Sequence, residues 1–352
     1  MDRRGFLGRL GGLGAGALLG ACGRDRRPAA GAELGPLEDR LNLYNWSDYI
    51  APDTVEGFER EFGVRVTYDT YESAEELLAR LQAGAAGYDV VFPSTYAVAA
   101  LVALRLARPL DQTRLPNLNS LSPLFRGLPH DPDLTWTVPW LWGTTGIAWR
   151  RDLVREPPSS WGVFLDAGWR AKMTMLDDMR DVLGSWLRFR GRSLNSVVPE
   201  ELEAAKRDAI AAKANLRAFV SAPVKAQLIA GDVLIAQLWN GDAAQARREQ
   251  PALEFALPRE GGTLWIDSMV IPAAAPHPRA AHEFINYALR PDVAAGIAAA
   301  TGYGTPNQAA MGRLADPVPY PSPNELARLE IQNDLGRASE LWDRIWTEVK
   351  SA

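Results

Sequence analysis

One carboxylate stands inside an otherwise apolar segment in the C-terminal half of the chain. Asp267 follows Trp265 in the run 261–272, where the residues alternate as in a β-strand. An ionised carboxylate in such surroundings needs a cationic partner. Capping of a turn, or pairing with a nearby arginine, would equally explain a lone aspartate. The motif therefore indicates a binding site only in combination with the other clusters in the chain.

Two more carboxylates begin a segment with helical periodicity, residues 179–189. Asp178 occupies the position of an N-cap and Asp181 the third helical position, which is a spacing similar to a capping box. Capping alone explains the pair. The same geometry also projects both carboxylates from one helix end into the space beyond a strand, where a buried pair would hold a cation.

Strands and helices alternate in the N-terminal part of the chain, in the order β-α-β-α-β. This order predicts a parallel sheet, and ligands of such sheets bind beyond the carboxyl ends of the strands. The expected elements are strands at 41–45, 64–68 and 89–92 and helices at 52–62 and 73–82.

Aromatic and hydroxyl residues follow two of these strands. Residues 46–49 come after the first strand and residues 94–96 after the third, so both clusters are expected to face one crevice. Packing of the aromatic rings, with Ser47 and Ser94 as helix N-caps, would also explain either cluster alone.

A second α/β unit is expected after a tryptophan-rich segment at 136–143. The glycine and threonines of residues 144–146 suit a crossover between domains, leading into a strand at 147–150. The further expected elements are helices near 160–167, 179–189, 200–219, 279–289, 292–300 and 324–349 and strands at 173–176 and 233–238.

The N-terminus has the features of an export signal. Residues 2–7, which include Arg3 and Arg4, resemble a twin-arginine signal, and a short glycine-rich apolar stretch follows them. Residues 19–22 resemble a lipoprotein processing box. Cys22 is the one cysteine of the chain, so it cannot form an internal disulfide, and the processing box favours lipid attachment over an idle thiol. We expect a signal over residues 1–22 and a flexible tether over residues 23–39.

Composition limits the class of function. A chain of 352 residues with a net charge of -5 is long enough for two domains, and its acidity argues weakly against nucleic acid while suiting a cationic ligand. The three histidines lie outside every cluster, and the chain has no phosphate-binding loop or metal-ligand spacing. Asp178 and Asp267 could form an acid/base pair in an enzyme, as in glycoside hydrolysis, but we expect no enzyme, cofactor or metal.

Seven motifs in order resemble those of the spermidine/putrescine-binding proteins of bacterial ABC importers. They are LYNWSDY (43–49), YES (71–73), PSTY (93–96), residues 231–241, WIDS (265–268), GYGTPN (302–307) and QND (332–334). The resemblance implies an α/β fold of the type II periplasmic-binding class, with a ligand cleft and a hinge between two domains. It places domain one at 40–146 plus 266–311 and domain two at 150–264 plus 314–352.

The same resemblance implies a set of polyamine contacts. They are Trp46, Ser47, Tyr49, Ser94, Tyr96, Asp178, Asp181, Trp239, Trp265, Asp267, Tyr303 and Gln332. A polyamine is a chain of methylenes with two or more ammonium groups, so aromatic walls and spaced carboxylates suit it. Ser47 stands where the family often has Thr and Asp181 where it often has Glu. The shorter Asp181 predicts that spermidine binds more tightly than putrescine.

The resemblance implies a role in transport rather than chemistry. We expect an extracytoplasmic, lipid-anchored monomer that captures spermidine or putrescine and delivers it to an ABC permease. Two alternatives use the same pocket: a polyamine sensor that docks on a membrane signalling protein, and an importer protein for another small cationic solute. Genomic neighbours would distinguish import from signalling, and a ligand panel would identify the solute.

Overall fold

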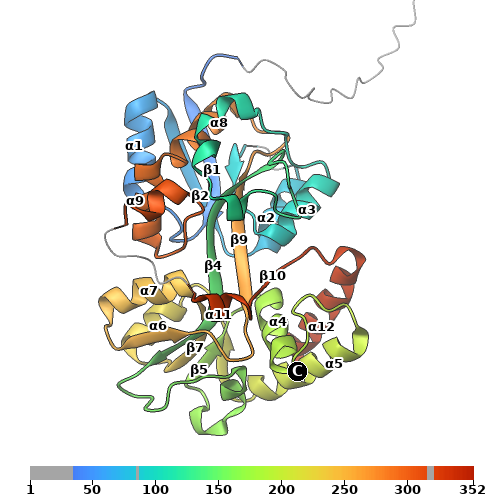
Figure 1. The fold of residues 1–352 in the computed structure, drawn as a ribbon. Coiled ribbons are helices and arrows are strands. Elements are labelled where there is room, and N and C mark those ends of the chain that lie inside the picture. Colours follow the sequence, from blue (N-terminus) through green and yellow to red (C-terminus); the bar gives the residue numbers. More distant parts are fainter. Residues whose placement is uncertain (1–34, 85–86, 315–320) are drawn as a thin grey trace, which may run out of the picture.

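A mixed sheet runs through two lobes that are joined by long strands (Figure 1). This computed structural model describes residues 35–84, 87–314 and 321–352. In this part of the chain the sheet has ten strands in the order β2-β1-β3-β9-β4-β7-β5-β6, with β10 paired to β9 and β8 paired to β4. The predicted signal, Cys22 and most of the predicted tether lie outside the described residues.

The upper lobe in Figure 1 contains the predicted β-α-β-α-β unit. Its elements are β1 (Arg40–Trp46), α1 (Pro52–Phe62), β2 (Arg65–Tyr71), α2 (Ala74–Gln82), β3 (Val90–Val91) and α3 (Thr95–Ala103). Strand β1 pairs in parallel with both β2 and β3, as the element order predicts. Helix α1 ends where the sequence indicates, because Gly63 adopts a left-handed conformation with φ 67°.

Strand β4 (Thr137–Arg150) crosses from one lobe to the other and is buried along its length (Figure 1). Its first half pairs with the antiparallel strand β9 (Thr263–Val270), and its second half pairs with strands of the lower lobe. We expected two strands separated near residues 144–146, and that prediction was wrong. The chain instead continues as one strand through Gly143 and Gly146. Glycine is needed at both positions because Trp265 and Phe255 occupy the space that a Cβ would need.

The lower lobe packs helices around the remaining strands. Its elements are β5 (Met173–Met175), α4 (Met179–Phe189), α5 (Pro199–Lys213), β6 (Leu216–Phe219), α6 (Val224–Ala230), β7 (Ile235–Trp239), α7 (Asn240–Glu249) and β8 (Leu253–Ala256). The helix expected over 200–219 ends at Lys213, because residues 216–219 instead pair in parallel with β5. The helix expected near 160–167 is a pair of 3-10 helices, Trp161–Leu165 and Ala167–Trp169.

The C-terminal part returns first to the upper lobe and then to the lower one. It forms α8 (Pro278–Ala288), α9 (Pro291–Thr301), α10 (Gln308–Met311), α11 (Pro323–Leu326), β10 (Glu330–Ile331) and α12 (Ser339–Ser351). The prediction of a helical region over 324–349 was wrong in its first part, because residues 330–331 pair with the start of β9. Trp342, Ile345 and Val349 of α12 are buried in the core of the lower lobe.

Short 3-10 helices complete the described chain. Besides the two 3-10 helices of residues 161–169, they are Gln112–Arg114, Pro116–Ser120, Pro123–Phe125 and Gly336–Ala338. Among the described residues, no helix combines the length and the apolar character that a membrane crossing requires.

Candidate functional site

A single cavity brings together all twelve residues that the sequence implicates. It encloses about 790 Å³, including the part open to solvent, and it lies where the two lobes meet. Its lining consists of Trp46, Ser47, Asp48, Tyr49, Glu72, Ser94, Tyr96, Asp178, Asp181, Ala222, Lys225, Trp239, Asp242, Trp265, Asp267, Tyr303 and Gln332. That these residues bind a ligand remains a prediction.

Strand ends and helix starts supply most of this lining. Trp46 ends β1, Trp239 ends β7, and Ser94 stands just before α3. Strand β9 crosses the floor and contributes Trp265 and Asp267, as its alternating sequence predicts. The carboxyl ends of strands therefore meet at the cavity, as in other α/β sheets.

Asp267 is a buried carboxylate without a cationic partner among the described residues. Its side chain accepts a hydrogen bond from the Ser94 hydroxyl at 2.6 Å, and the residue is only 5% exposed. Burial raises the pKa of Asp267 to about 7, and the Ser94 hydrogen bond offsets part of that rise. An ion pair with a nearby arginine would have marked Asp267 as a structural residue. Among the described residues Asp267 forms no such ion pair.

The pair Asp178 and Asp181 satisfies both interpretations of its spacing. Asp178 caps α4 by accepting a hydrogen bond from the Asp181 amide at 2.8 Å, and both side chains also line the cavity. Burial, and then the neighbouring Asp181, raises the pKa of Asp178 to about 8. Burial also raises the pKa of Asp181. In the described residues neither carboxylate forms an ion pair, and the nearby Arg180 guanidinium offsets only part of the rise in the two pKa values.

Neutral donors fix the Asp181 carboxylate in place. The Thr145 hydroxyl donates to it at 2.9 Å, and the indole Nε1 of Trp239 donates to its other oxygen at 2.9 Å. Gln332 contributes a longer contact of 3.4 Å. The short aspartate side chain is therefore held by groups on β4, β7 and the C-terminal segment.

Arg180 lies between these two aspartates in sequence, but its hydrogen bonds go to other residues of the protein. Its guanidinium donates to the Asn333 carbonyl at 2.9 Å and to the Asn195 side chain at 2.8 Å. It also lies over the rings of Tyr96 at 5.3 Å and Trp342 at 5.0 Å, measured to each centroid. Arg180 is not part of the cavity lining.

Three aromatic rings form one wall of the cavity. The centroid of Tyr303 lies 5.1 Å from that of Tyr49 and 5.1 Å from that of Trp265. The indole nitrogen of Trp265 is buried without a hydrogen-bond partner in the described chain. The Tyr49 hydroxyl lies near Asp267 yet makes no hydrogen bond of acceptable geometry. A wall with unused polar atoms suits an apolar chain that carries hydrogen-bonding ends.

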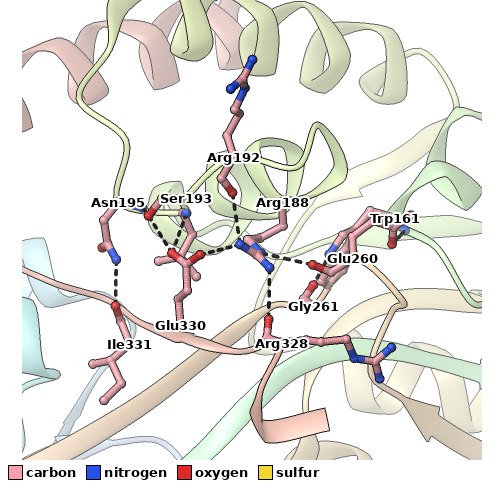
Figure 2. A network of polar contacts seen from close by, with 11 residues as sticks. Trp161, Arg188, Arg192, Ser193, Asn195, Glu260, Gly261, Arg328, Glu330 and Ile331 are labelled. Carbon is pink, nitrogen blue, oxygen red and sulfur yellow. Dashed lines mark hydrogen bonds and ion pairs between the residues drawn. The ribbon is translucent and has the colours of Figure 1, made fainter. Parts of the chain in front are cut away.

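A polar network holds the segment that carries Gln332 (Figure 2). Glu330 of β10 accepts hydrogen bonds from Arg188 and from the Ser193 hydroxyl, the latter at 2.6 Å. The Asn195 amide donates to the Ile331 carbonyl at 2.9 Å. Figure 2 also shows Arg188 donating to the backbone carbonyls of Glu260 and of Arg328, two residues before the strand. The network lies in the lower lobe and fixes the chain immediately before Gln332.

Five lining residues were not predicted from the sequence: Asp48, Glu72, Ala222, Lys225 and Asp242. Asp48 and Glu72 stand within motifs that the sequence analysis identified, and Asp242 follows the 231–241 motif directly, so proximity to those motifs was an available signal. Lys225 and Ala222 had none, because they belong to α6 and the turn before it, which no sequence pattern connected to the cleft.

Most of the charged groups of the cavity are carboxylates spaced along an aromatic wall. Among residues 35–84, 87–314 and 321–352, no group of three or more His, Cys, Asp or Glu side chains is arranged to hold a metal ion. Spaced carboxylates along an aromatic wall suit an elongated organic cation.

Known proteins share this sequence over most of its length. The profile of the bacterial extracellular solute-binding protein family matches residues 53–317. The chain is 36% identical to the spermidine/putrescine-binding periplasmic protein of Salmonella typhimurium, over 89% of this chain and 92% of that protein. It is 33% identical to the putrescine-binding periplasmic protein PotF of Escherichia coli, over 97% of both chains.

Solved structures share the fold as well. A putative spermidine/putrescine ABC transporter protein from Listeria monocytogenes superposes with a TM-score of 0.84 at 33% identity, covering 89% of this chain and 99% of that one. The similarity covers both lobes, so the expected two-domain α/β architecture is confirmed.

Proposed function

We propose, from the premise that this chain belongs to the bacterial extracellular solute-binding protein family, that it captures a polyamine in the cavity between its lobes for delivery to an ABC permease. One observation carries the proposal: the carboxylates of Asp181 and Asp267 are buried and that of Asp178 is half-buried around one aromatic cavity, and none of the three forms an ion pair in the described chain. Relatives that share a third of the sequence are named as binders of spermidine and putrescine.

The chemistry of a polyamine fits each part of this cavity. Its ammonium groups would neutralise the carboxylates, whose raised pKa values indicate that they are unstable as charged groups in the empty site. Its methylenes would lie against Trp265, Tyr303 and Tyr49, where cation-π attraction adds to the burial of apolar surface. Gln332, Tyr96 and Ser47 would complete the hydrogen bonds.

Capture would couple to closure of the lobes. Residues 40–146 with 266–311 would move as one body and residues 150–264 with 314–352 as the other, bending where β4 and β9 pass between them. Contacts from both bodies exist only when they are together, so the ligand favours the closed state. The protein itself performs no covalent chemistry in this proposal.

Titration calorimetry against a ligand panel tests the proposed function. Putrescine, cadaverine and spermidine should bind, whereas butylamine, with one charge, and neutral 1,4-butanediol should bind far more weakly. Equal affinity for putrescine and butanediol would contradict the proposal, because it would show that charge is not what the cavity recognises. A panel without any bound amine would point to another solute, one of the alternatives that the sequence leaves open.

Lipid attachment at Cys22 is part of the proposal, supported by the processing box at residues 19–22. We expect Cys22→Ser to abolish incorporation of a labelled fatty acid and to release the protein from the membrane. Calorimetry on the purified body should give the same ligand affinity for both proteins, because residue 22 lies far in sequence from every lining residue. Equal labelling of wild type and variant would refute the anchor without touching the binding function.

A further inference from the structure

Lys225 places a positive charge inside the cavity that otherwise collects carboxylates. It is the one Lys or Arg among the described lining residues. Its ammonium lies 2.8 Å from a carboxylate oxygen of Asp48 and 3.7 Å from one of Asp242, and it also donates to the Gln245 side chain at 3.1 Å. Although burial works against the charge, Asp242 and Asp48 raise the pKa of Lys225 above its usual value, so the ammonium is charged.

The carboxylates divide into two groups along the cavity. In addition to burial, the charge of Asp181 raises the pKa of both Asp267 and Asp178, whereas the pKa of Asp242 is lowered by Lys225 and raised by Asp48. The ring of Tyr303 lies between the groups, packed on Trp265 while its hydroxyl donates to Asp242 at 3.0 Å. The first group forms no ion pair in the described chain, and its nearby Arg180 lies outside the cavity lining, whereas the second group already has the Lys225 ammonium.

The Lys225–Asp48 pair also separates two cavities. Both residues line the main cavity and a neighbouring one, whose other lining residues include Gln245 and Glu249. The half-buried Lys225 side chain, paired with the exposed Asp48, therefore lies at the boundary between the two cavities. Without the lysine side chain, the slot would extend toward a second space that contains the carboxylate of Glu249.

We propose that Lys225 determines ligand length: its ammonium occupies the position beside Asp242 and Asp48 that a third ligand ammonium would take, so the cavity selects diamines over triamines. The proposal rests on the proposed function and names the substrate class within it. A diamine places its two charges at Asp267 and at the Asp178–Asp181 pair. A triamine must bring its third charge against Lys225.

The shorter Asp181 predicts the opposite ranking, and the two effects differ in size. Asp181 withdraws one carboxylate by about one bond length, ~1.5 Å, and Thr145 and Trp239 already hold it there. Lys225 already fills the position between Asp48 and Asp242 and compensates part of their charge in a partly buried site. A third ligand ammonium therefore loses both the space and most of the attraction there, which costs more. The lysine therefore dominates, and the wild type binds putrescine more tightly than spermidine.

Removal of the lysine tests the proposal by calorimetry with both ligands. Lys225→Met should shift the ratio of the two dissociation constants in favour of spermidine by about tenfold or more, because a charged position becomes free. Lys225→Gln, which keeps a hydrogen-bonding group without the charge, should shift it in the same direction and guards against misfolding of the first variant. Lys225→Arg should keep the wild-type ratio within about threefold.

A matched control separates selection from closure, because the Lys225–Asp48 pair also joins the two lobes. Arg248 of α7 donates to the Ala299 and Ala300 carbonyls of α9 and lies outside the cavity lining. Arg248→Met should weaken both ligands alike and leave their ratio unchanged. An unchanged ratio in Lys225→Met, or an equal shift in Arg248→Met, would overturn the proposal. A wild type that binds no polyamine would instead refute the proposed function.

Discussion

Asp267 and Asp242 line one cavity, and burial raises the pKa of both, yet their partners differ. Asp242 has the Lys225 ammonium at 3.7 Å and the Tyr303 hydroxyl at 3.0 Å. Asp267 has the Ser94 hydroxyl at 2.6 Å and no cation in the described chain. The protein thus completes one charge pair itself and leaves the other incomplete.

This difference shows how a binding site is distinguished from a structural ion pair. A buried carboxylate without a counter-charge destabilises the empty protein, and a cationic ligand relieves that cost when it binds. A carboxylate that already has a lysine gains less from a ligand. Four experiments test the contrast, in order of decreasing expected effect.

Asp267→Asn should cause the largest change in ligand affinity. Removing the counter-charge of a desolvated ammonium should weaken polyamine binding by on the order of 2 to 5 kcal/mol, as measured by titration calorimetry. If Asp267→Asn binds as tightly as the wild type, Asp267 is a structural residue and the comparison fails.

The same substitution should stabilise the ligand-free protein at neutral pH. The pKa of Asp267 is about 7 in the folded state against a reference value of 3.8. Its contribution to stability is therefore fully present below pH 3.8 and is lost as the pH rises through 7. The loss amounts to at most about 4 kcal/mol. Urea unfolding at pH 5 and pH 8 should show a smaller decline for Asp267→Asn. Parallel declines in the two proteins would show that Asp267 does not titrate in this range.

Asp242→Asn is the matched comparison, since it makes the same change in the same cavity. We expect it to weaken diamine binding by only about 1 kcal/mol, because Lys225 remains paired with Asp48. Calorimetry at the same pH and salt gives the direct contrast with Asp267→Asn. A loss as large as that of Asp267→Asn would mean that a ligand ammonium contacts Asp242 in spite of the lysine.

Glu330→Gln should have the smallest effect, acting through the position of Gln332. The Glu330–Arg188 pair is partly exposed, so the affinity should fall by less than about 1 kcal/mol. Asp208→Asn serves as the control. It breaks another partly exposed ion pair, the one with Arg190 at the end of α4. Both variants should lose similar stability in urea, but only Glu330→Gln should lose affinity. Equal affinities would show that the network of Figure 2 does not position Gln332.

The sequence predicted local structure well where a signal lies within a few residues. Gly63 ends α1, and Asp178 begins α4, because each acts on its own backbone. Residues 216–219 and 330–331 were assigned to helices because their sequences carry helical periodicity. They form strands only because β5 and β9 offer edges that lie far away in the chain. A sequence window does not contain those partners.

The site divides in the same way. Asp267 and Trp265 were identifiable because a carboxylate is unusual in an apolar strand. Lys225 was not, because a lysine in a short amphipathic helix is ordinary until α6 packs beside the loop that carries Asp48. The groups that bind were therefore visible in the sequence, and the group that we infer to limit the ligand was visible only in the fold.

The position of β9 between β3 and β4 has a consequence for the order of folding. Its residues 263–270 are made long after β3 and β4, so until then a growing chain exposes an unpaired edge on each of those strands. The lower lobe waits longer still, because its core includes α12 near the C-terminus. Neither lobe can be completed from a continuous stretch of nascent chain, and both must close over long loops. Folding is therefore expected to finish after synthesis, with the upper lobe ready to form before the lower one.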